Sequence, residues 1–326
     1  MFGNPIFADK INTAIENAQL PFEPQNLYEP IRYMLSLSGK RIRPQLVFLG
    51  AELFGFTDVE KLLPAALAVE FFHNFSLIHD DIMDKAPLRR GKSTVHQKWT
   101  DNVAILSGDA LLVKAYEQLS KCPVQAIPEL LRTFNNVAIE VCEGQQYDMD
   151  FELREDVSQA EYIDMIRLKT SVLLGGALEM GAIIADASAA DRQKLYEFGV
   201  NLGIAFQLQD DILDAFGNPE TFGKQVGGDI IVNKKTILHI LLKEQLVSAT
   251  DKSNFNLILK LSENSAQEKI GQMISLYHTY NIEEKANTLK EYYTAKAYEL
   301  LGNIQVEDNF KVNLYELADK LMVRVR

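Results

Sequence analysis

The stretch from Glu70 to Asp84 reads EFFHNFSLIHDDIMD and carries the pattern that decides the fold. Its apolar residues recur at spacings of three and four, which is the period of one face of an α-helix. On such a helix Asp80 and Asp84 lie one turn apart on the same face, with Asp81 beside them. We therefore predict a largely apolar helix that ends in a patch of three carboxylates.

A second stretch, from Phe206 to Asp214, repeats the pattern as FQLQDDILD. Asp210, Asp211 and Asp214 have the same DDxxD spacing and also follow an apolar helical run. A single DDxxD in so acidic a protein is most often a solvated helix end. Two copies, each after an apolar helical run, instead favour a function for both aspartate trios.

The repeated carboxylates indicate a bound cation. Like charges at four-residue spacing repel one another, so each trio needs compensation. Carboxylate oxygens are typical ligands of Mg²⁺, whose remaining positions are often filled by substrate phosphates. We expect the two trios to face each other and to hold one diphosphate through shared magnesium ions. His73 and Gln207 lie on the same helix stripes, where an interior polar residue satisfied by its neighbours is the default interpretation.

The rest of the chain also follows the helical period. Sustained period-two alternation and Asn-Gly or Asp-Gly hairpin signals are missing. The intervals between breaks suit helices of roughly 10 to 25 residues joined by short loops. We predict an all-α fold, a large antiparallel helical bundle around a central cavity, with residues 1–326 as a single domain. The breaks lie at Pro21, Pro24, Pro30, Gly39–Pro44, Pro64, Pro87–Gly91, Pro123, Pro128 and Gly217–Gly228.

The composition is that of a soluble globular protein, with 47% hydrophobic and 24% charged residues. Its formal net charge of −12 disfavours binding to nucleic acid and to anionic lipid headgroups. The two cysteines, Cys122 and Cys142, provide neither a disulfide framework nor a zinc spacing. The first residues lack the pattern of a signal peptide, and no uninterrupted apolar segment has the length of a membrane span. We expect a cytoplasmic protein without stable membrane insertion.

Basic residues gather near both trios, against the acidic background. A charge run is usually a solvated face, but a diphosphate site needs metals on one side and fixed cations on the other. Lys169 and Thr170 fall in an apolar helix expected from Tyr162 to Met180, where the lysine needs a partner. The other basic groups are Lys40, Arg41 and Arg43, then Arg89 and Arg90, then Lys224 and Lys234.

Over nearly its whole length the chain resembles the trans-isoprenyl diphosphate synthase family, the polyprenyl synthetases. The resemblance implies the isoprenoid synthase fold, magnesium as cofactor, a homodimer, and small-molecule diphosphates as substrates. It implies a head-to-tail condensation of isopentenyl diphosphate with an allylic diphosphate. The motifs that carry it are, in order, GKRIRP at 39–44, HNFSLIHDDIMD at 73–84, LRRGKST at 88–94, GDALL at 108–112, GQQYD at 144–148, KTSVL at 169–173, FQLQDDILD at 206–214, GKQVGGDI at 223–230 and NKKT at 233–236.

The resemblance also implies roles for the residues at matching positions. Three magnesium ions that hold the allylic diphosphate would be ligated by Asp80, Asp84 and Asp210, and their shell would be completed or supported by Asp81, Asp211 and Asp214. The same diphosphate would be bound by Arg89, Lys169, Lys224 and Lys234, with Thr170 and Gln207 near its reacting carbon. Isopentenyl diphosphate would be bound by Lys40, Arg43, His73 and Arg90. Released pyrophosphate would accept the proton, so no acid–base pair of the protein is required.

Two departures from the family pattern stand out. Asn233 occupies a position where many relatives have glycine, although Lys234 after it is retained. The first trio has two residues between its aspartates, whereas one bacterial branch of short-chain enzymes has four. The chain is therefore expected to lie outside that branch.

The first helix also bears on product length, because the growing tail would descend along it below Asp80. Phe75 lies roughly 7.5 Å deeper at the helical rise, with Ser76 beside it and Phe72 further below. In this family an aromatic at such a position resembles a floor for short products, although ordinary core packing is the alternative interpretation. We predict a fifteen- or twenty-carbon product and favour twenty, geranylgeranyl diphosphate, because Ser76 is small. Farnesyl diphosphate or a longer polyprenyl product stays open.

Three other functions fit parts of the pattern. A class I terpene cyclase uses an aspartate-rich helix and magnesium, but it needs no second diphosphate site. A catalytically silent subunit of a synthase would be expected to have lost one aspartate trio, and this chain has both. A di-metal carboxylate bundle protein would need a Glu-x-x-His motif on each of two facing helices, and no such pair is found because the motif occurs once, at Glu70–His73. The condensing enzyme remains the favoured hypothesis.

Overall fold

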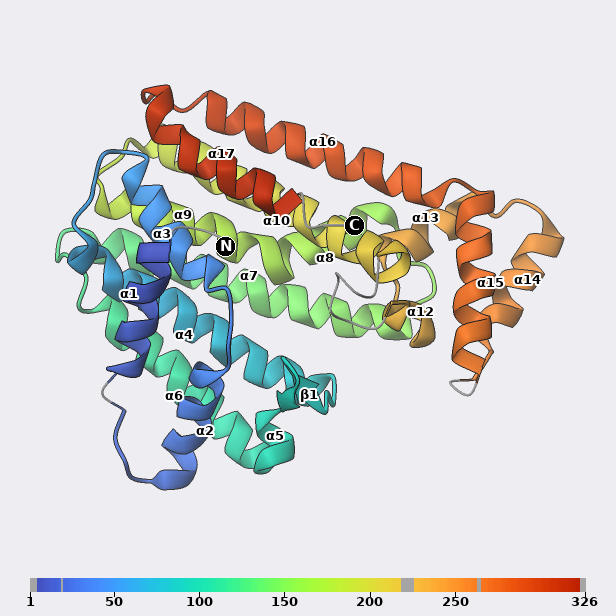
Figure 1. Ribbon diagram of the computed structural model, residues 1–326, viewed down its shortest axis with the longest axis horizontal. Coiled ribbons are helices and arrows are strands. Elements are labelled where there is room, and N and C mark those ends of the chain that lie inside the picture. The colour runs from blue at the N-terminus through green and yellow to red at the C-terminus, as the bar shows by residue number, and fades with distance from the viewer. Residues whose placement is uncertain (1–4, 19, 218–225, 263–264, 323–326) are drawn as a thin grey trace. The chain divides into compact units, whose positions relative to one another are not determined.

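The computed structural model describes residues 5–18, 20–217, 226–262 and 265–322, and its long elements are α-helices (Figure 1). The predicted all-α fold is confirmed. The first nine helices are α1 (Pro5–Glu16), α2 (Gln25–Ser36), α3 (Ile42–Glu52), α4 (Val59–Met83), α5 (Val95–Lys98), α6 (Asp101–Leu119), α7 (Ile127–Leu153), α8 (Gln159–Ile166) and α9 (Val172–Ile184). The remaining described helices are α10 (Ala189–Phe216), α12 (Gly228–Ile231), α13 (Ile237–Gln245), α14 (Ala249–Leu259), α15 (Ala266–Thr279), α16 (Ile282–Gly302) and α17 (Asp308–Met322).

Contacts between residues divide the chain into two compact units, and each unit is built from separated segments. One domain around a central cavity stays a prediction. Unit 1 consists of Met1–Ile139, Leu173–Tyr196 and Ile304–Leu317. Unit 2 consists of Glu140–Val172, Glu197–Asn303 and Ala318–Arg326.

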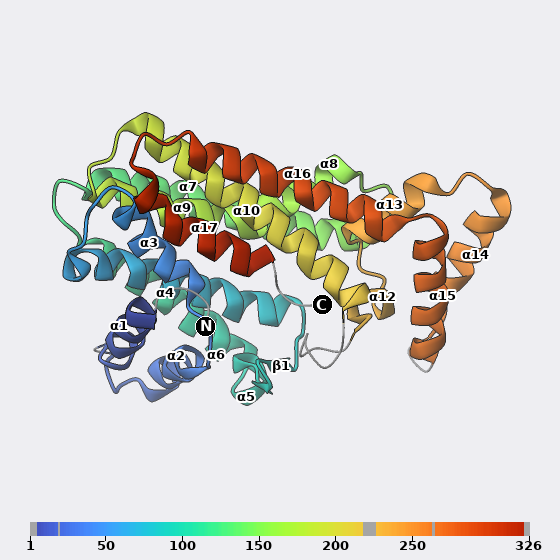
Figure 2. The same ribbon diagram turned by 45° about the horizontal axis from the view of Figure 1, so that its top comes forward.

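Helix α4 forms the core of unit 1. It packs against α3 and α6, and α6 runs alongside it in Figures 1 and 2. Side chains are buried along α4 from Leu62 to Asp81, on nearly every face, which is typical of a core helix. In the described part of the chain, α4 alone has the length and apolar composition of a membrane span. Within the most apolar 18-residue segment of α4, 67% is buried inside the protein, as expected for a core helix.

Several prolines lie inside helices rather than between them, contrary to the prediction. Pro30 and Pro64 each fall in the second turn of their helices, α2 and α4. Pro44 and Pro128 fall in the first turns of α3 and α7, where a backbone N–H has no intrahelical partner. A proline this close to a helix start removes few hydrogen bonds, so the helix continues through it. Helices α7 and α10 are longer than predicted, at 27 and 28 residues.

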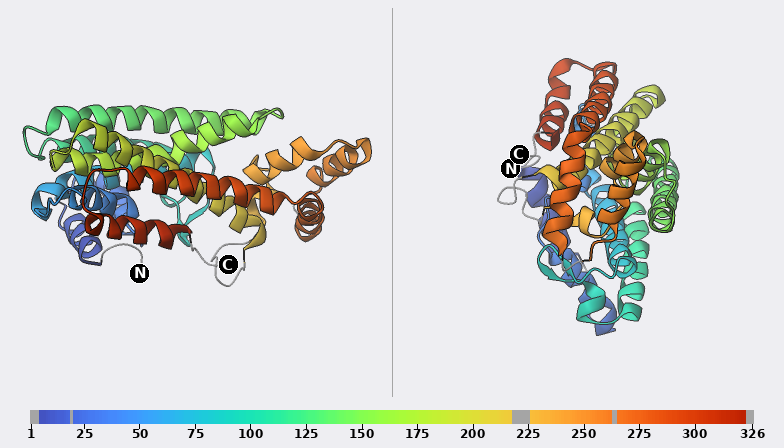
Figure 3. Two further views of the ribbon diagram at one scale, coloured as in Figure 1. Left: turned by 90° about the horizontal axis from the view of Figure 1, so that it is seen from above. Right: turned by 90° about the vertical axis from the view of Figure 1, so that its right-hand side faces the viewer.

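Unit 2 is built around α13, which packs against α8, α15 and α16. The residues of α13 from Ile237 to Leu242 are all buried, so this short helix contacts neighbours on every side. Helices α14 and α15 lie side by side in both views of Figure 3. Within this unit, residues of α12 and α13 donate hydrogen bonds to the second aspartate trio of α10.

The helix expected from Tyr162 to Met180 is instead α8, a π-helical turn η1 (Arg167–Ser171), and α9. The hydroxyl of Ser171 donates to the carbonyl of Ile166 at 3.2 Å, five residues earlier. Such turns are often found at functional sites. This one carries Lys169, so it determines where that lysine lies.

Candidate active site

The first aspartate trio ends α4, and its buried member is bound to an arginine. Asp81 is 2% exposed, and its carboxylate accepts hydrogen bonds from Arg89 Nε at 2.9 and 2.8 Å. The Nη2 atom of Arg89 also lies 3.4 Å from Asp80 Oδ2. Burial raises the pKa of Asp81, while the hydrogen bond from Arg89 lowers it. Asp81 thus fixes the position of Arg89, whereas Asp80 is 19% exposed and Asp84 is more open to solvent.

A short hairpin follows the trio and separates its two arginines. Strands β1 (Leu88–Arg89) and β2 (Lys92–Ser93) pair antiparallel, with Leu88 opposite Ser93. The two loop residues, Arg90 and Gly91, both have positive φ, at 53° and 74°. Positive φ at both positions is typical of the type I′ turn that two-residue hairpin loops favour. Arg89 therefore reaches Asp81, while Arg90 donates from Nη1 to the carbonyl of Leu37 at 3.1 Å.

A histidine lies among arginines in the same unit. Arg43 Nη1 is 3.3 Å from His73 Nε2. The pKa of His73 lies well below its usual value, first because the ring is buried and then because of the charges of Arg43, Arg90, Arg89 and Arg41. His73 is therefore neutral, and this part of an acidic protein is locally cationic. Lys40 is exposed in the same segment, just before α3.

The second aspartate trio lies on α10, and its buried member is held by two donors. Asp211 is 8% exposed, and its Oδ2 atom accepts from the Tyr162 hydroxyl at 2.5 Å and from the backbone N–H of Ile237 at 3.1 Å. Burial raises the pKa of Asp211 to about 7, and the Tyr162 hydrogen bond opposes that rise. As in the first trio, the middle aspartate is the one enclosed by the protein.

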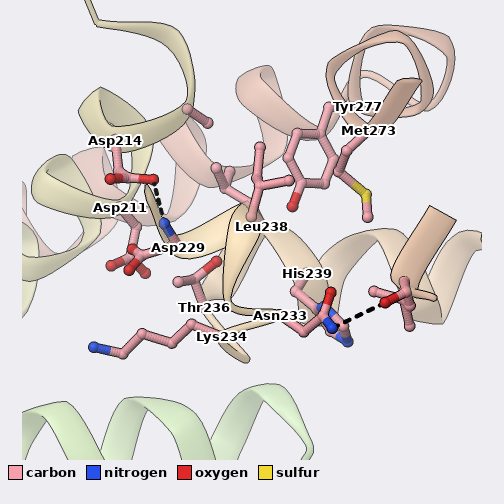
Figure 4. Close-up of a pocket in the computed structure, with 13 residues that line it drawn as sticks. Asp211, Asp214, Asp229, Asn233, Lys234, Thr236, Leu238, His239, Met273 and Tyr277 are labelled. Carbon is pink, nitrogen blue, oxygen red and sulfur yellow. Dashed lines mark hydrogen bonds between the residues drawn. The ribbon is translucent and has the colours of Figure 1, made fainter. Parts of the chain in front are cut away.

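A pocket in unit 2 is lined by carboxylates of α10 and α12. Figure 4 shows Asp211, Asp214 and Asp229 grouped on one side, with the Lys234 side chain extending nearby. The backbone N–H of Asp229 donates to Asp214 Oδ2 at 3.0 Å. Since α12 begins at Gly228, this bond ties the start of α12 to the second trio.

Lys169 has the partner that the sequence required but did not identify. Its Nζ atom donates to Asp148 Oδ2 at 2.5 Å, and the two side chains are 23% and 17% exposed. Gly144 of α7 makes this approach possible, because a Cβ atom there would lie 2.2 Å from the backbone nitrogen of Lys169. Both the close backbone packing and the ion pair lie within unit 2.

The remaining predicted residues are placed as follows. Thr170 lies in η1 and is half-buried, as are Gln207 and Asp210 on α10. Lys234 is exposed after α12, and Lys224 lies outside the described residues. Within unit 1 the structure brings together Arg43 with His73 and Arg89 with the first trio. The second trio belongs to unit 2, so the prediction that the two trios face each other stays a prediction.

The predicted chain-length residues form an aromatic row in unit 1. Phe75 is half-buried, and its ring centroid lies 4.8 Å from that of His79 and 5.6 Å from that of Phe72. Phe72 is 1% exposed and contacts the Phe134 ring edge to face at 5.4 Å. Ser76 is half-buried and donates to the carbonyl of His73. Phe72 is thus core, and Phe75 is the more accessible aromatic of the row.

Four residues that shape these clusters were not assigned from the sequence. Tyr162 and Asp229 hold the second trio, Asp148 pairs with Lys169, and Glu70 pairs with Arg41. The sequence contained a signal for Asp148 and Asp229, because they lie within the recognised motifs GQQYD and GKQVGGDI. Tyr162 lies outside the recognised motifs, seven residues before KTSVL.

The donor chemistry of the trios suits magnesium. In the described part of the chain, no three His, Cys, Asp or Glu side chains converge into a metal site of their own. Asp80, Asp84 and Asp210 offer carboxylate oxygens, the hard ligands that Mg²⁺ prefers, and Mg²⁺ commonly completes its shell with water and substrate phosphate. The trios therefore fit an ion that is bound jointly with a diphosphate.

Comparison with known proteins identifies the family. The family model described as polyprenyl synthetase matches residues 24–296. The chain belongs to the polyprenyl synthetase family. This synthetase is therefore a transferase of prenyl groups, and magnesium is the general cofactor of such enzymes. The resemblance stated from the motifs is confirmed.

Individual relatives agree with this assignment. The geranylgeranyl diphosphate synthase of Methanosarcina mazei is 42% identical over 233 residues, which are 71% of each chain. The geranylfarnesyl diphosphate synthase of Natronomonas pharaonis is 38% identical over 255 residues, 72% of this chain and 74% of the relative. A crystal structure of a geranylgeranyl pyrophosphate synthase superposes with a TM-score of 0.90 at 43% identity and covers 98% of this synthetase and 97% of that chain.

Proposed function

We propose that this polyprenyl synthetase joins isopentenyl diphosphate head-to-tail to an allylic diphosphate. The observation that supports this most is the set of arginine charges around the neutral His73, with Arg43 at 3.3 Å from its ring. A condensing enzyme needs a second diphosphate site beside the aspartates, whereas a terpene cyclase does not. Isopentenyl diphosphate binds this cluster. Its ligands are Lys40, Arg43, His73 and Arg90.

The allylic diphosphate binds at the aspartate trios. Three magnesium ions would be held by Asp80, Asp84 and Asp210, and when bound they would stabilise the negative charge of the leaving diphosphate. Asp81, Asp211 and Asp214 would complete or support the shell of these ions. The cationic side chains for the same diphosphate are Arg89, Lys169, Lys224 and Lys234, with Thr170 and Gln207 near the reacting carbon.

The condensation requires no acid–base pair from the protein. The allylic C–O bond breaks, and its electron pair leaves with the diphosphate, whose charge Arg89 and Lys169 stabilise. The double bond of isopentenyl diphosphate, held by Arg43 and His73, then forms the new C–C bond. A proton leaves the adjacent carbon, restores a double bond and passes to the released pyrophosphate. Apolar helix faces keep water from the allylic cation.

The product is geranylgeranyl diphosphate. Relatives at similar identity are named geranylgeranyl and geranylfarnesyl diphosphate synthases, which bracket twenty and twenty-five carbons. The half-buried Phe75, backed by Phe72, supports a floor for the growing tail and hence the shorter product. Farnesyl diphosphate or a longer polyprenyl diphosphate would be the alternative outcome.

The proposal extends to assembly and compartment. We infer a homodimer that acts in the cytoplasm on small diphosphates, without nucleic acid and without stable insertion into a membrane. The formal net charge of −12 supports the exclusion of nucleic acid, because a strongly acidic surface repels phosphate backbones. Sedimentation of the purified protein tests the dimer.

A direct assay tests the reaction. The protein is incubated with isopentenyl diphosphate, Mg²⁺, and dimethylallyl, geranyl or farnesyl diphosphate, and products are identified by mass spectrometry. We expect geranylgeranyl diphosphate as the main product from each starter and no product with excess EDTA. Arg43→Ala should raise the KM for isopentenyl diphosphate about tenfold or more while changing the allylic KM little. Pyrophosphate release from an allylic substrate alone, with isopentenyl diphosphate unconsumed, would contradict the proposal.

A further inference from the structure

A buried ion pair, Arg41–Glu70, adjoins residues of the proposed isopentenyl diphosphate site. Arg41 Nη1 is 2.5 Å from Glu70 Oε1, and the two side chains are 5% and 2% exposed. Asn74, one turn further along α4, donates to the same Glu70 oxygen at 2.8 Å. A charged pair so fully removed from water needs good geometry on both partners, because each charge has lost its hydration. The function proposed above assigns no role to this pair.

Arg41 also donates to the backbone of the preceding segment, while its Nε atom donates to Asn12 Oδ1 at 3.4 Å. Its Nη2 atom donates to the carbonyl of Leu35 at 2.6 Å and to that of Leu37 at 3.3 Å. The residue itself has a φ of 47°, the left-handed region that a side chain with a Cβ rarely adopts. The guanidinium therefore fastens the turn between α2 and α3 onto Glu70 of α4.

The same turn holds Arg90. The carbonyl of Leu37 accepts from Arg90 Nη1 at 3.1 Å, so two guanidinium groups share one backbone oxygen. The Arg90 guanidinium lies against Gly39, where a Cβ atom would be 2.7 Å from Nη1. The position of Arg90 therefore depends on the position of the Leu37–Gly39 backbone, which Arg41 sets.

The pair also bears on Arg43 and His73. Arg41 is the residue before α3, and Arg43 is in the first turn of that helix. His73 lies one turn after Glu70 on α4, so the pair joins the two helices that carry these side chains. Glu70 further supplies the buried negative charge beside a cluster of four arginines, and it reduces their mutual repulsion.

We propose that Arg41 and Glu70 are positioning residues for isopentenyl diphosphate: the buried pair fixes Arg90, Arg43 and His73 without touching the substrate. This inference rests on the proposed function of that cluster. It predicts that weakening the pair impairs binding of isopentenyl diphosphate selectively. A pair that served stability alone would affect both substrates alike.

Steady-state kinetics of Arg41→Lys test the inference. Lysine keeps the charge but cannot hold a carboxylate and two carbonyls with one planar fork. We expect the KM for isopentenyl diphosphate to rise roughly tenfold, as for loss of one charge-assisted hydrogen bond, with the allylic KM within about twofold. The matched control is Arg192→Lys, which weakens the Arg192–Glu129 ion pair elsewhere in unit 1 and should leave both KM values unchanged.

Gly39→Ala tests the contact between this turn and Arg90 independently of whether Arg41→Lys folds. Gly39 is exposed and its φ is not in the left-handed region, so Gly39→Ala should keep the melting temperature while its methyl group displaces the Arg90 guanidinium. We expect a several-fold rise in the KM for isopentenyl diphosphate alone. Equal rises in both KM values, or no rise in either variant, would overturn the positioning role.

The direct variants separate this inference from the proposed function. If Arg43→Ala and Arg90→Ala raise the KM for isopentenyl diphosphate but Arg41→Lys and Gly39→Ala do not, the site stands and the positioning role fails. If Arg43→Ala and Arg90→Ala leave that KM unchanged, the assignment of the site itself fails.

Discussion

The hydroxyl of Tyr162 on α8 donates a 2.5 Å hydrogen bond to Asp211 on α10, the enclosed member of the second aspartate trio. Asp81 has the equivalent place in the first trio, where it is bound by Arg89. In both motifs the middle aspartate is enclosed by protein donors, and its neighbours are more exposed. The two DDxxD motifs therefore share one feature, a middle carboxylate that is buried and bound by protein donors.

Tyr162→Phe tests the anchor of the second trio. The variant leaves a buried carboxylate with one donor fewer, so we expect the free energy of unfolding to fall by about 1–3 kcal/mol. Tyr298→Phe is the matched control, because its hydroxyl also donates to an aspartate, Asp319, at 2.5 Å but on the exposed surface. Urea denaturation should show little loss for the control. Equal losses in both variants would argue against a buried anchor.

The raised pKa of Asp211 predicts a pH dependence of the metal-free protein. A carboxyl whose pKa is about 7 when folded and near 4 when unfolded binds its proton more tightly in the folded state. Its contribution to stability is complete below pH 4 and is lost as the pH rises through 7. The loss is on the order of 4 kcal/mol. The buried His239, whose pKa is about 4, acts in the opposite direction, because its contribution is lost as the pH falls below 6.5.

Asp211→Asn separates the contribution of Asp211 to the pH dependence of stability from that of His239. Unfolding free energies of the wild type and Asp211→Asn are compared in EDTA between pH 4 and 7.5. We expect the wild type to lose stability relative to the variant as the pH rises. Asp156→Asn removes an exposed carboxyl with a lowered pKa, and it should not reproduce this trend. A difference that stays constant with pH would contradict the raised pKa of Asp211.

Gly144→Ala tests the close packing behind Lys169. The new methyl group would lie 2.2 Å from the backbone nitrogen of Lys169, so α7 and the π-helical turn must separate. We expect a loss of about 1–3 kcal/mol in unfolding free energy and a raised KM for the allylic diphosphate. Gly271→Ala is the control, since nothing lies within 4 Å of a Cβ atom there on α15. That variant should be neutral or stabilised by up to about 1 kcal/mol.

Phe75→Ala tests the floor of the product tail. Removal of the ring opens space beside Phe72 and His79, so the product distribution should shift from twenty toward twenty-five carbons or more. Products are compared by mass spectrometry with those of Phe310→Ala, an exposed aromatic on α17. An unchanged distribution in Phe75→Ala would refute the gate and leave Phe75 as a core residue.

The sequence was sufficient for the fold class and for the location of the trios on helices. Spacing of three and four is a local property, so α4 and α10 could be predicted together with the faces that carry their aspartates. The helix boundaries predicted from proline positions were partly wrong, because Pro64 lies in the second turn of α4 and does not end a helix. The π-helical turn at Lys169 gave no signal either, since its residues, RLKTS, include neither Gly nor Pro to indicate a break.

The partners of the functional residues could not be predicted in the same way. Asp211 is bound by Tyr162, Lys169 by Asp148, and Glu70 by Arg41. Each pair is separated by 21 residues or more along the chain. No periodicity links such positions, because tertiary packing brings them together.

Both aspartate trios are proposed to hold one diphosphate through magnesium, and calorimetric titration with inorganic pyrophosphate tests that proposal. The titration compares the wild type with Asp84→Asn, from the first trio, and Asp210→Asn, from the second. We expect tight binding by the wild type in the presence of Mg²⁺, none in EDTA, and at least about tenfold weaker binding by each variant. Wild-type affinity in either variant would mean that its trio does not bind the diphosphate, and the account would be contradicted.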